Sequence, residues 1–181
     1  MWYYTSDLHF GHANIIKYCG RPFNSVEEMN DNLVVNWNSR VQPDDTVFIL
    51  GDLTMANCEL ALKYLKMLNG HKILIPGNHD TYVFKNSFPE NGLSSNFEVI
   101  TEAMTVVTDP FVNTRIVLCH YPIAVWKGKE RGDLHFYGHV HNSTQEMYPY
   151  LYKIDNAYNV GVDVQGYYPC TAQEIINSKQ K

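Results

Sequence analysis

The sequence predicts an α/β protein in which a partly parallel β-sheet is layered against helices. Three observations support this class. Short apolar and β-branched runs recur along the chain, helical patterns separate the runs of the first half, and the later runs follow one another more closely. Strands that alternate with helices are typical of layered α/β folds, because parallel strands need long crossover connections. At 181 residues, with no linker or internal repeat, the chain is expected to form one domain over residues 1–181.

The strands are predicted from short apolar runs that are bounded by Gly, Pro, Asn or Asp. Continuous runs of this kind indicate strands that are buried on both faces. In chain order, the predicted strands are 2–5, 46–50, 72–75, 99–107, 115–119, 134–137 and 159–164.

Three helices are predicted from capping residues followed by apolar residues three or four positions apart. Ser25 and Glu28 form a capping box ahead of a helical pattern that reaches Trp37. Asn57 is the expected cap of a second helix, which ends before an Asn-Gly pair. A further capping box, residues 171–174, opens a short final helix.

The composition is that of an ordinary globular protein, and it excludes several classes. Of the residues, 45% are hydrophobic and 18% are charged, and no apolar run reaches the ~18 residues of a membrane helix. No signal sequence is evident and the four cysteines form no CxxC pair, so we expect a cytoplasmic protein with reduced thiols and no membrane partner. A formal charge of −5 argues against a broad nucleic-acid-binding surface, which is normally basic.

Five of the apolar runs are followed by residues that commonly bind metal ions. Because residues two apart on a strand project from one face, the pair in "SDLHF" and the pair in "FYGHVH" are each expected to converge. Ligands bind at the carboxyl ends of strands in α/β sheets, so all five ends are expected to meet at one edge. The candidate ligands are Asp7, His9, Asp52, Asn78, His120, His139 and His141.

This set contains two carboxylates, one amide oxygen, four imidazoles and no thiolate. Seven ligands are too many for one tetrahedral zinc ion, but they suit two adjacent divalent ions that share a carboxylate and a water molecule or hydroxide. Imidazole and oxygen ligands fit manganese, iron, zinc or nickel without ranking them. Two such ions outweigh the two carboxylates, so the sequence predicts a positive pocket that attracts phosphate in an acidic protein.

Five short blocks of the sequence, taken in order, resemble those of the calcineurin-like metallophosphoesterases. They are Asp7-Leu8-His9, Gly51-Asp52, Gly77-Asn78-His79-Asp80, Cys119-His120 and Gly138-His139-Val140-His141. The longer stretches "SDLHFGHANII", "RPF" and "EEMN" are similar to a compact bacterial and phage branch of that superfamily. The resemblance implies a β-sandwich of mixed sheets flanked by helices, with a dinuclear metal site at the carboxyl ends of the strands.

The resemblance also implies roles for individual residues. Three side chains hold each ion and a seventh bridges the pair: Asp7, His9 and His141 for the first ion, Asn78, His120 and His139 for the second, and Asp52 between them. His79 follows a ligand directly and is expected to face the substrate. There it would protonate the leaving oxygen or stabilise charge on the phosphate, with Asp80 orienting its ring.

Departures from the family's patterns narrow the expected function. Protein Ser/Thr phosphatases of this superfamily carry GDxxDRG and GNHE blocks, whereas this chain reads "GDLTMAN" and "GNHD". The superfamily's DNA-repair exonucleases add a capping domain for which this chain has no room. We therefore expect a phosphodiesterase that cleaves small nucleotide-like substrates by attack of a hydroxide held between two metal ions. A short single strand of nucleic acid remains a candidate substrate.

Two alternative functions stay open. The first is a phosphomonoesterase or nucleotidase, because the metal-binding motifs do not separate diesters from monoesters. The second is a non-catalytic scaffold, like a retromer subunit of this superfamily that has lost the catalytic histidine; this chain retains His79. By analogy with superfamily members of this size, a homodimer is a further expectation.

Three other residues are candidates for substrate contacts, each with a structural alternative. His12 lies in a Gly-led loop beside the first ligands and is a candidate for touching the substrate phosphate. Arg21 is a candidate phosphate clamp, with a surface or salt-bridge role equally open. Trp126, in the polar segment 125–133, is a candidate for stacking on a base; otherwise that segment is a solvated connection. His135 is expected to be structural.

Overall fold

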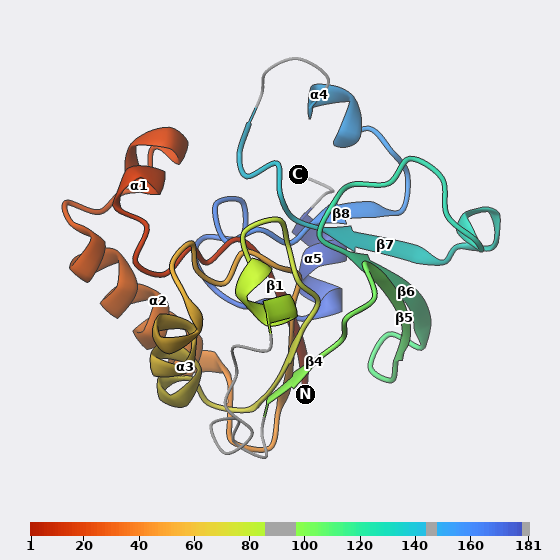
Figure 1. Ribbon diagram of the computed structural model, residues 1–181. Helices are drawn as coiled ribbons and strands as arrows, with labels where there is room; N and C mark the ends of the chain where they lie inside the picture. Colours follow the sequence, from red (N-terminus) through yellow and green to blue (C-terminus); the bar gives the residue numbers. More distant parts are fainter. Residues whose placement is uncertain (86–96, 144–147, 179–181) are drawn as a thin grey trace.

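The computed structural model describes residues 1–85, 97–143 and 148–178, which form two four-stranded sheets with helices around them (Figure 1). The first sheet contains β1 (Trp2–Thr5), β2 (Thr46–Ile49), β3 (His71–Leu74) and β4 (Phe97–Val99). The second contains β5 (Met104–Asp109), β6 (Thr114–Cys119), β7 (Leu134–Tyr137) and β8 (Ala157–Asn159). The helices are α1 (Ala13–Cys19), α2 (Val26–Arg40), α3 (Cys58–Met67), α4 (Tyr148–Leu151), α5 (Ala172–Ser178) and the 3₁₀ turns η1 (Thr81–Lys85) and η2 (Lys129–Arg131). Among the helices of these segments, none combines the length and apolar character needed to cross a membrane.

The strand order places the carboxyl ends of the central strands at one edge. In the first sheet the order is β1-β2-β3-β4, and every pairing is parallel. Thr5 pairs with Ile49 and Ile49 pairs with Leu74, so the ends of β1, β2 and β3 are level. In the second sheet β6, β7 and β8 are parallel, and β5 is antiparallel at the edge. The segments that follow β1, β2 and β3 therefore leave their sheet side by side.

The two sheets pack face to face around an apolar layer. The ring centroid of Tyr4 in β1 lies 4.9 Å from that of Phe136 in β7 and 5.4 Å from that of Phe48 in β2. All three side chains are buried. The other face of the first sheet packs against α2 and α3, where Trp37 and Leu65 are buried. This arrangement confirms the predicted layered α/β sandwich of mixed sheets flanked by helices.

The three predicted helices begin where the capping residues indicated. Ser25 Oγ accepts a hydrogen bond from Glu28 N at 3.1 Å, and Asn57 Oδ1 accepts one from Leu60 N at 3.0 Å. Thr171 Oγ1 accepts in the same way at the start of α5. Helix α1 has no such signal, because the histidine ahead of it makes no side-chain cap. The sequence therefore does not predict α1.

Two predicted strands are wrong in extent. The run 99–107, predicted as one strand, is divided between β4 and β5, which belong to different sheets. The run 159–164 contributes only Asn159 to β8, after which Gly161 makes an isolated bridge to Ser6. Apolar character does not say which sheet each residue joins, and in the run 99–107 it does not indicate burial either, because Met104 and Val106 are 48% and 44% exposed.

Candidate metal centre

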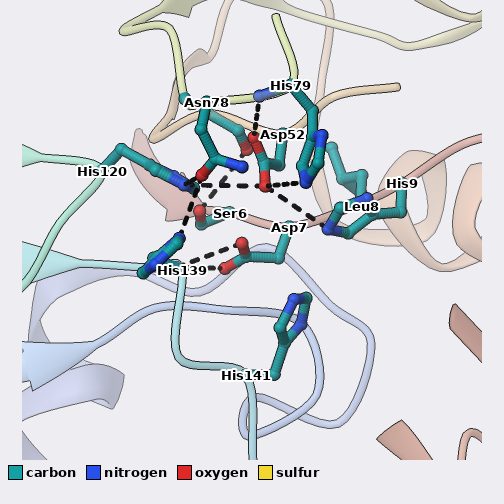
Figure 2. A network of polar contacts seen from close by, with 12 residues as sticks. Ser6, Asp7, Leu8, His9, Asp52, Asn78, His79, His120, His139 and His141 are labelled. Carbon is teal, nitrogen blue, oxygen red and sulfur yellow. Dashed lines mark hydrogen bonds and ion pairs between the residues drawn. The ribbon is translucent and has the colours of Figure 1, made fainter. Parts of the chain in front are cut away.

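The structure brings all seven candidate ligands together at the edge where the strands end (Figure 2). Asp7 and His9 come from the segment after β1, and Asp52 comes from the segment after β2. The others follow β3, β6 and β7, and they are Asn78, His120, His139 and His141. Four of the seven are at most 2% exposed to solvent: Asp7, His9, Asp52 and His120. Both sheets therefore contribute to one partly buried cluster of ligand-type side chains.

Five of these seven residues have a left-handed backbone, with φ between 49° and 70°. They are Asp7, His9, Asp52, His139 and His141. Such angles are uncommon outside glycine and cost on the order of 1–3 kcal/mol each, so they persist only where the surrounding structure enforces them. The paired side chains were predicted to converge because residues two apart on a strand share a face, and that reason is wrong. Strands β1 and β7 end at Thr5 and Tyr137, and the paired side chains converge through bends beyond the strands.

Contacts between neighbouring segments hold these bends in place. Asp7 N donates a hydrogen bond to Gly51 O at 3.0 Å. His139 N donates to the carboxylate of Asp7, with distances of 3.0 and 3.1 Å to its two oxygens. A Cβ atom at position 138 would lie 2.5 Å from Asp7 Oδ2, so only a glycine allows the end of β7 to approach this closely.

One histidine in the first half of the cluster lacks the hydrogen-bond partners that a buried polar group normally has. Asp7, His9 and His141 place ligand atoms within 4.8 Å of one another. Within the described segments, neither ring nitrogen of His9 has a hydrogen-bond partner, and both are buried. Burial raises the pKa of Asp7 to about 6, and burial together with His141 lowers the pKa of His9 to about 2. A bound cation would satisfy these groups, so the residues fit a metal ion.

In the other half of the cluster, nitrogen atoms of two histidine rings face the same side-chain oxygen. Leu50 O can only accept, so His120 Nδ1, 2.8 Å away, donates to it, and the matching neutral tautomer would have no proton on Nε2. That Nε2 lies 3.0 Å from Asn78 Oδ1, and His139 Nδ1 lies 3.0 Å from the same oxygen. A cation between these atoms would turn repulsion between acceptors into attraction. Ligands held ~2.1 Å from a tetrahedral ion are themselves only ~3.4 Å apart, so these separations are compatible with a shared ion.

Asp52 lies between the two halves. Its Oδ2 is 3.5 Å from His9 Nε2 and 3.6 Å from His120 Nε2. Its other carboxylate oxygen, Oδ1, accepts a hydrogen bond from His79 N at 3.0 Å. One carboxylate oxygen within reach of both groups is the arrangement that two metal ions with a shared ligand require.

Asp163 is a member of the cluster that the sequence reasoning missed. His141 Nδ1 donates to Asp163 Oδ2 at 2.8 Å. Burial acts to lower the pKa of His141, but the hydrogen bond to Asp163 and the interactions with Cys19 and Asp7 together raise that pKa to about 10. Asp163 lies in a stretch that the sequence indicates as a strand, and no local motif marks it as a partner of His141.

Arg21 is not a phosphate clamp, which corrects that candidate role in favour of its salt-bridge alternative. Its Nε and Nη2 donate to the two oxygens of Asp163 at 2.8 and 3.0 Å, and the side chains of both residues are fully enclosed. The guanidinium also donates to the backbone oxygens of Asp7 and Leu8, at 2.8 and 3.0 Å. Arg21 therefore connects the backbone of Asp7 and Leu8 to the side chain of Asp163.

His79 and Asp80 have separate positions. The side chain of His79 is 37% exposed and lines a groove above the cluster, with Nε2 4.0 Å from Asp52 Oδ2. Asp80 is fully buried, and its carboxylate accepts hydrogen bonds from Asp52 N at 2.6 Å and Gly77 N at 2.9 Å. It also accepts from Tyr82 Oη at 2.8 Å. Asp80 therefore ties two ligand segments together, and this corrects its expected role of orienting the His79 ring.

The remaining candidates for substrate contact differ in position. His12 lines the groove, and its ring centroid lies 5.4 Å from that of His9. Trp126 is only 7% exposed, and its Nε1 donates to Asp133 O at 3.0 Å. Its ring packs at 5.2 Å from His135, which is itself fully buried. The structure therefore corrects the proposed base stacking by Trp126 and places His135 in a structural role, as expected.

Comparisons with known proteins agree with this geometry. The sequence profile of the calcineurin-like phosphoesterases matches residues 3–164. Over 181 residues, the chain is 34% identical to an uncharacterized protein of Methanocaldococcus jannaschii, covering 99% of this chain and 91% of the relative. It is 28% identical over 160 residues to the gene 66 protein of Mycobacterium phage L5, covering 77% of each chain. The crystal structure of a protein of unknown function from Aquifex aeolicus is similar, with a TM-score of 0.70, 28% identity and 98% of each chain covered.

The family match and the geometry of the cluster lead to the same conclusion. The matched residues include every one of the seven ligand-type side chains. Carboxylate, amide and imidazole donors at these separations suit divalent transition-metal ions. The chain therefore belongs to the calcineurin-like phosphoesterase family of metal-dependent phosphoester hydrolases.

Proposed function

We propose that this protein hydrolyses phosphodiester bonds of small nucleotide-like molecules with two divalent metal ions. The observation that carries the proposal is the position of Asp52, whose Oδ2 lies within 3.6 Å of an imidazole nitrogen in each half of the cluster. The proposed ligands are Asp7, His9 and His141 for one ion and Asn78, His120 and His139 for the other. Manganese, iron, zinc and nickel all suit this donor set.

The protein's own side chains orient the reaction. When bound, the ions would supply Lewis-acid neutralisation of the phosphate and a water nucleophile with a pKa lowered from ~16 toward ~7. His79 faces the groove, and its backbone N–H donates to Asp52 Oδ1 at 3.0 Å, which keeps the ring next to the bridging carboxylate. From this position a protonated ring would give its proton to the departing oxygen. His12, whose ring centroid lies 5.4 Å from that of His9, is the proposed second contact for the substrate phosphate.

The lining of the groove supports a diester over a monoester. A phosphate monoester carries nearly two negative charges at neutral pH and a diester carries one, and arginine side chains are the usual additional partners of phosphate. Of the lining residues in the described segments, none is lysine or arginine. The guanidinium of Arg21 is enclosed below the cluster. A singly charged diester is therefore the better match, and a phosphomonoesterase or nucleotidase is the alternative.

Two chromogenic substrates test this proposal. With Mn²⁺ added, we expect kcat/KM for bis-p-nitrophenyl phosphate to exceed that for p-nitrophenyl phosphate, and EDTA to remove both activities. Equal or better use of the monoester would favour the monoesterase alternative. A protein that binds no metal and shows no hydrolysis with Mn²⁺, Ni²⁺, Zn²⁺ or Fe²⁺ would instead be a non-catalytic scaffold.

Replacement of Asp163 by asparagine is expected to weaken metal binding while the protein stays folded. The variant removes the charge of the carboxylate that accepts from both His141 Nδ1 and the enclosed Arg21 guanidinium. Outer partners of metal-binding histidines contribute ~10–100-fold to affinity, so the dissociation constant for Mn²⁺ is expected to rise by about that factor. Isothermal titration calorimetry measures the change directly.

The matched control for this variant is Asp109→Asn. Asp109 is also buried, at 1% exposure, and accepts from Tyr4 Oη at 2.7 Å, but it lies at the end of β5 that is remote from the ligands. We expect Asp109→Asn to lower the melting temperature without changing Mn²⁺ affinity. An equal loss of affinity in both variants would show that Asp163 acts only through general stability.

A further inference from the structure

We propose that helix α1 provides a binding surface for the planar base of a single nucleotide, with Tyr18 as the stacking platform. The inference rests on the proposed function, because it concerns the groove that opens onto the same cluster. It goes further by naming the group that is recognised beside the phosphate. The metal ions would not make that choice, since they would interact only with the phosphate and the attacking water.

Tyr18 presents an exposed aromatic side chain to the groove. It is 74% exposed, whereas its helix neighbours Ile15 and Cys19 are 4% and 9% exposed and hold α1 against the core. All three line the groove. A tyrosine offers a large contact face at low cost in conformational entropy, and aromatic faces of this kind stack on nucleobases.

His12 connects Tyr18 to the buried cluster. Its ring centroid lies 6.1 Å from that of Tyr18, with an interplanar angle of 75°, and 5.4 Å from that of His9. Three rings therefore lead in steps from the exposed Tyr18 to a proposed metal ligand. Nδ1 of His12 is buried, and no residue of the described segments forms a hydrogen bond with it. A substrate with its phosphate at the cluster would extend its attached group along this line of rings.

The size and charge of the groove fit one nucleotide. Its volume is about 710 Å³, within the range of ~300–1,000 Å³ typical of pockets for single small ligands. Besides the histidines, the described lining is apolar, aromatic, hydroxyl or amide, as in Met55 and Asn142, and it includes no Lys, Arg, Asp or Glu. A nucleic-acid strand is normally held by a basic groove that follows its backbone. The uncharged lining therefore favours a neutral base on one phosphate over a polyanionic strand.

Two cyclic phosphodiesters test the inference, because they share a five-membered phosphate ring and differ in the attached group. Adenosine 2′,3′-cyclic phosphate carries a base, and glycerol 1,2-cyclic phosphate does not. Tyr18→Ala is expected to lower the ratio of their kcat/KM values by about 5- to 150-fold, the range that one stacked base contributes. Tyr18→Phe keeps the ring and is expected to keep the ratio. Phosphorus NMR follows the hydrolysis of both substrates.

Binding of AMP to the Mn²⁺-loaded protein gives a second readout that needs no turnover. Calorimetry is expected to show the same loss of affinity for Tyr18→Ala. The matched control is Tyr150→Ala, which removes a tyrosine that is 64% exposed on α4 and does not line the groove. If Tyr18→Ala changes neither the substrate ratio nor AMP binding, the stacking surface is refuted while the proposed function stands. If the wild-type protein hydrolyses neither diester but binds AMP through Tyr18, the proposed function fails and the stacking surface is supported.

Discussion

Asp52→Asn is expected to abolish binding of the metal pair and, with it, phosphoester hydrolysis. Asparagine has nearly the same shape and tolerates the left-handed backbone at this position, where φ is 54°. Its amide oxygen also retains the bond from His79 N, so the variant mainly removes one negative charge between the two halves of the cluster. Loss of an outer-sphere partner already costs ~10–100-fold in metal affinity, so loss of a shared charged ligand is expected to exceed ~100-fold.

Metal content and activity measured on the same preparation check this expectation. Mass spectrometry of the dialysed protein counts the ions per chain, and initial rates with bis-p-nitrophenyl phosphate follow hydrolysis. Thermal unfolding shows whether the fold is intact, and Asp109→Asn controls for the loss of a buried carboxylate elsewhere. If Asp52→Asn kept two ions and wild-type rates, Asp52 would not be a shared ligand.

His79→Ala is expected to reduce kcat by ~10²–10⁴-fold for substrates with poor leaving groups, the usual contribution of a general acid. The reason is that a departing alkoxide needs a proton, whereas p-nitrophenolate leaves without one. We therefore expect a much smaller loss with bis-p-nitrophenyl phosphate than with a cyclic nucleotide. Metal content is expected to stay at the wild-type level, because the side chain of His79 faces the groove and is 37% exposed.

The control for this variant is His71→Ala. His71 begins β3 and pairs with Glu98 at 3.2 Å, and its side chain is 30% exposed, similar to that of His79. We expect His71→Ala to keep both metal content and turnover. Loss of bound metal in His79→Ala would mean that His79 is itself a ligand and that its assignment as a proton donor is wrong.

The positions of the ligands along the chain were predictable because the motifs follow apolar runs. Apolar runs indicate buried strands, and the carboxyl ends of parallel strands lie at the same edge of a sheet in whatever order the strands are arranged. Thr5, Ile49 and Leu74 are level in the first sheet, so residues shortly after them emerge together. The start of α2 was equally predictable from its capping box, because Ser25 and Glu28 are only three positions apart and contact each other within one helical turn.

The partners of buried polar residues were not predictable in the same way. Arg21 and Asp163 lie 142 positions apart and meet only because the two sheets dock, so the sequence leaves a phosphate clamp and an internal ion pair equally open. Trp126 has the composition of a stacking residue, yet its indole N–H is committed to Asp133 O. In each case the sequence shows the type of the residue, but it does not show which distant residue or backbone atom that side chain contacts in the fold.

By itself, the sequence predicted which residues are candidates for the chemistry, which elements they follow and which family the chain resembles. Each of these depends on patterns within a few positions of one another. Tertiary structure alone decided where the side chains point. Left-handed bends at Asp7, Asp52 and His139 are enforced by bonds between segments that are distant along the chain. The physical reason is that an unfavourable backbone angle is stable only when contacts from several segments outweigh its cost, and those contacts exist only after the strands have paired and the two sheets have packed.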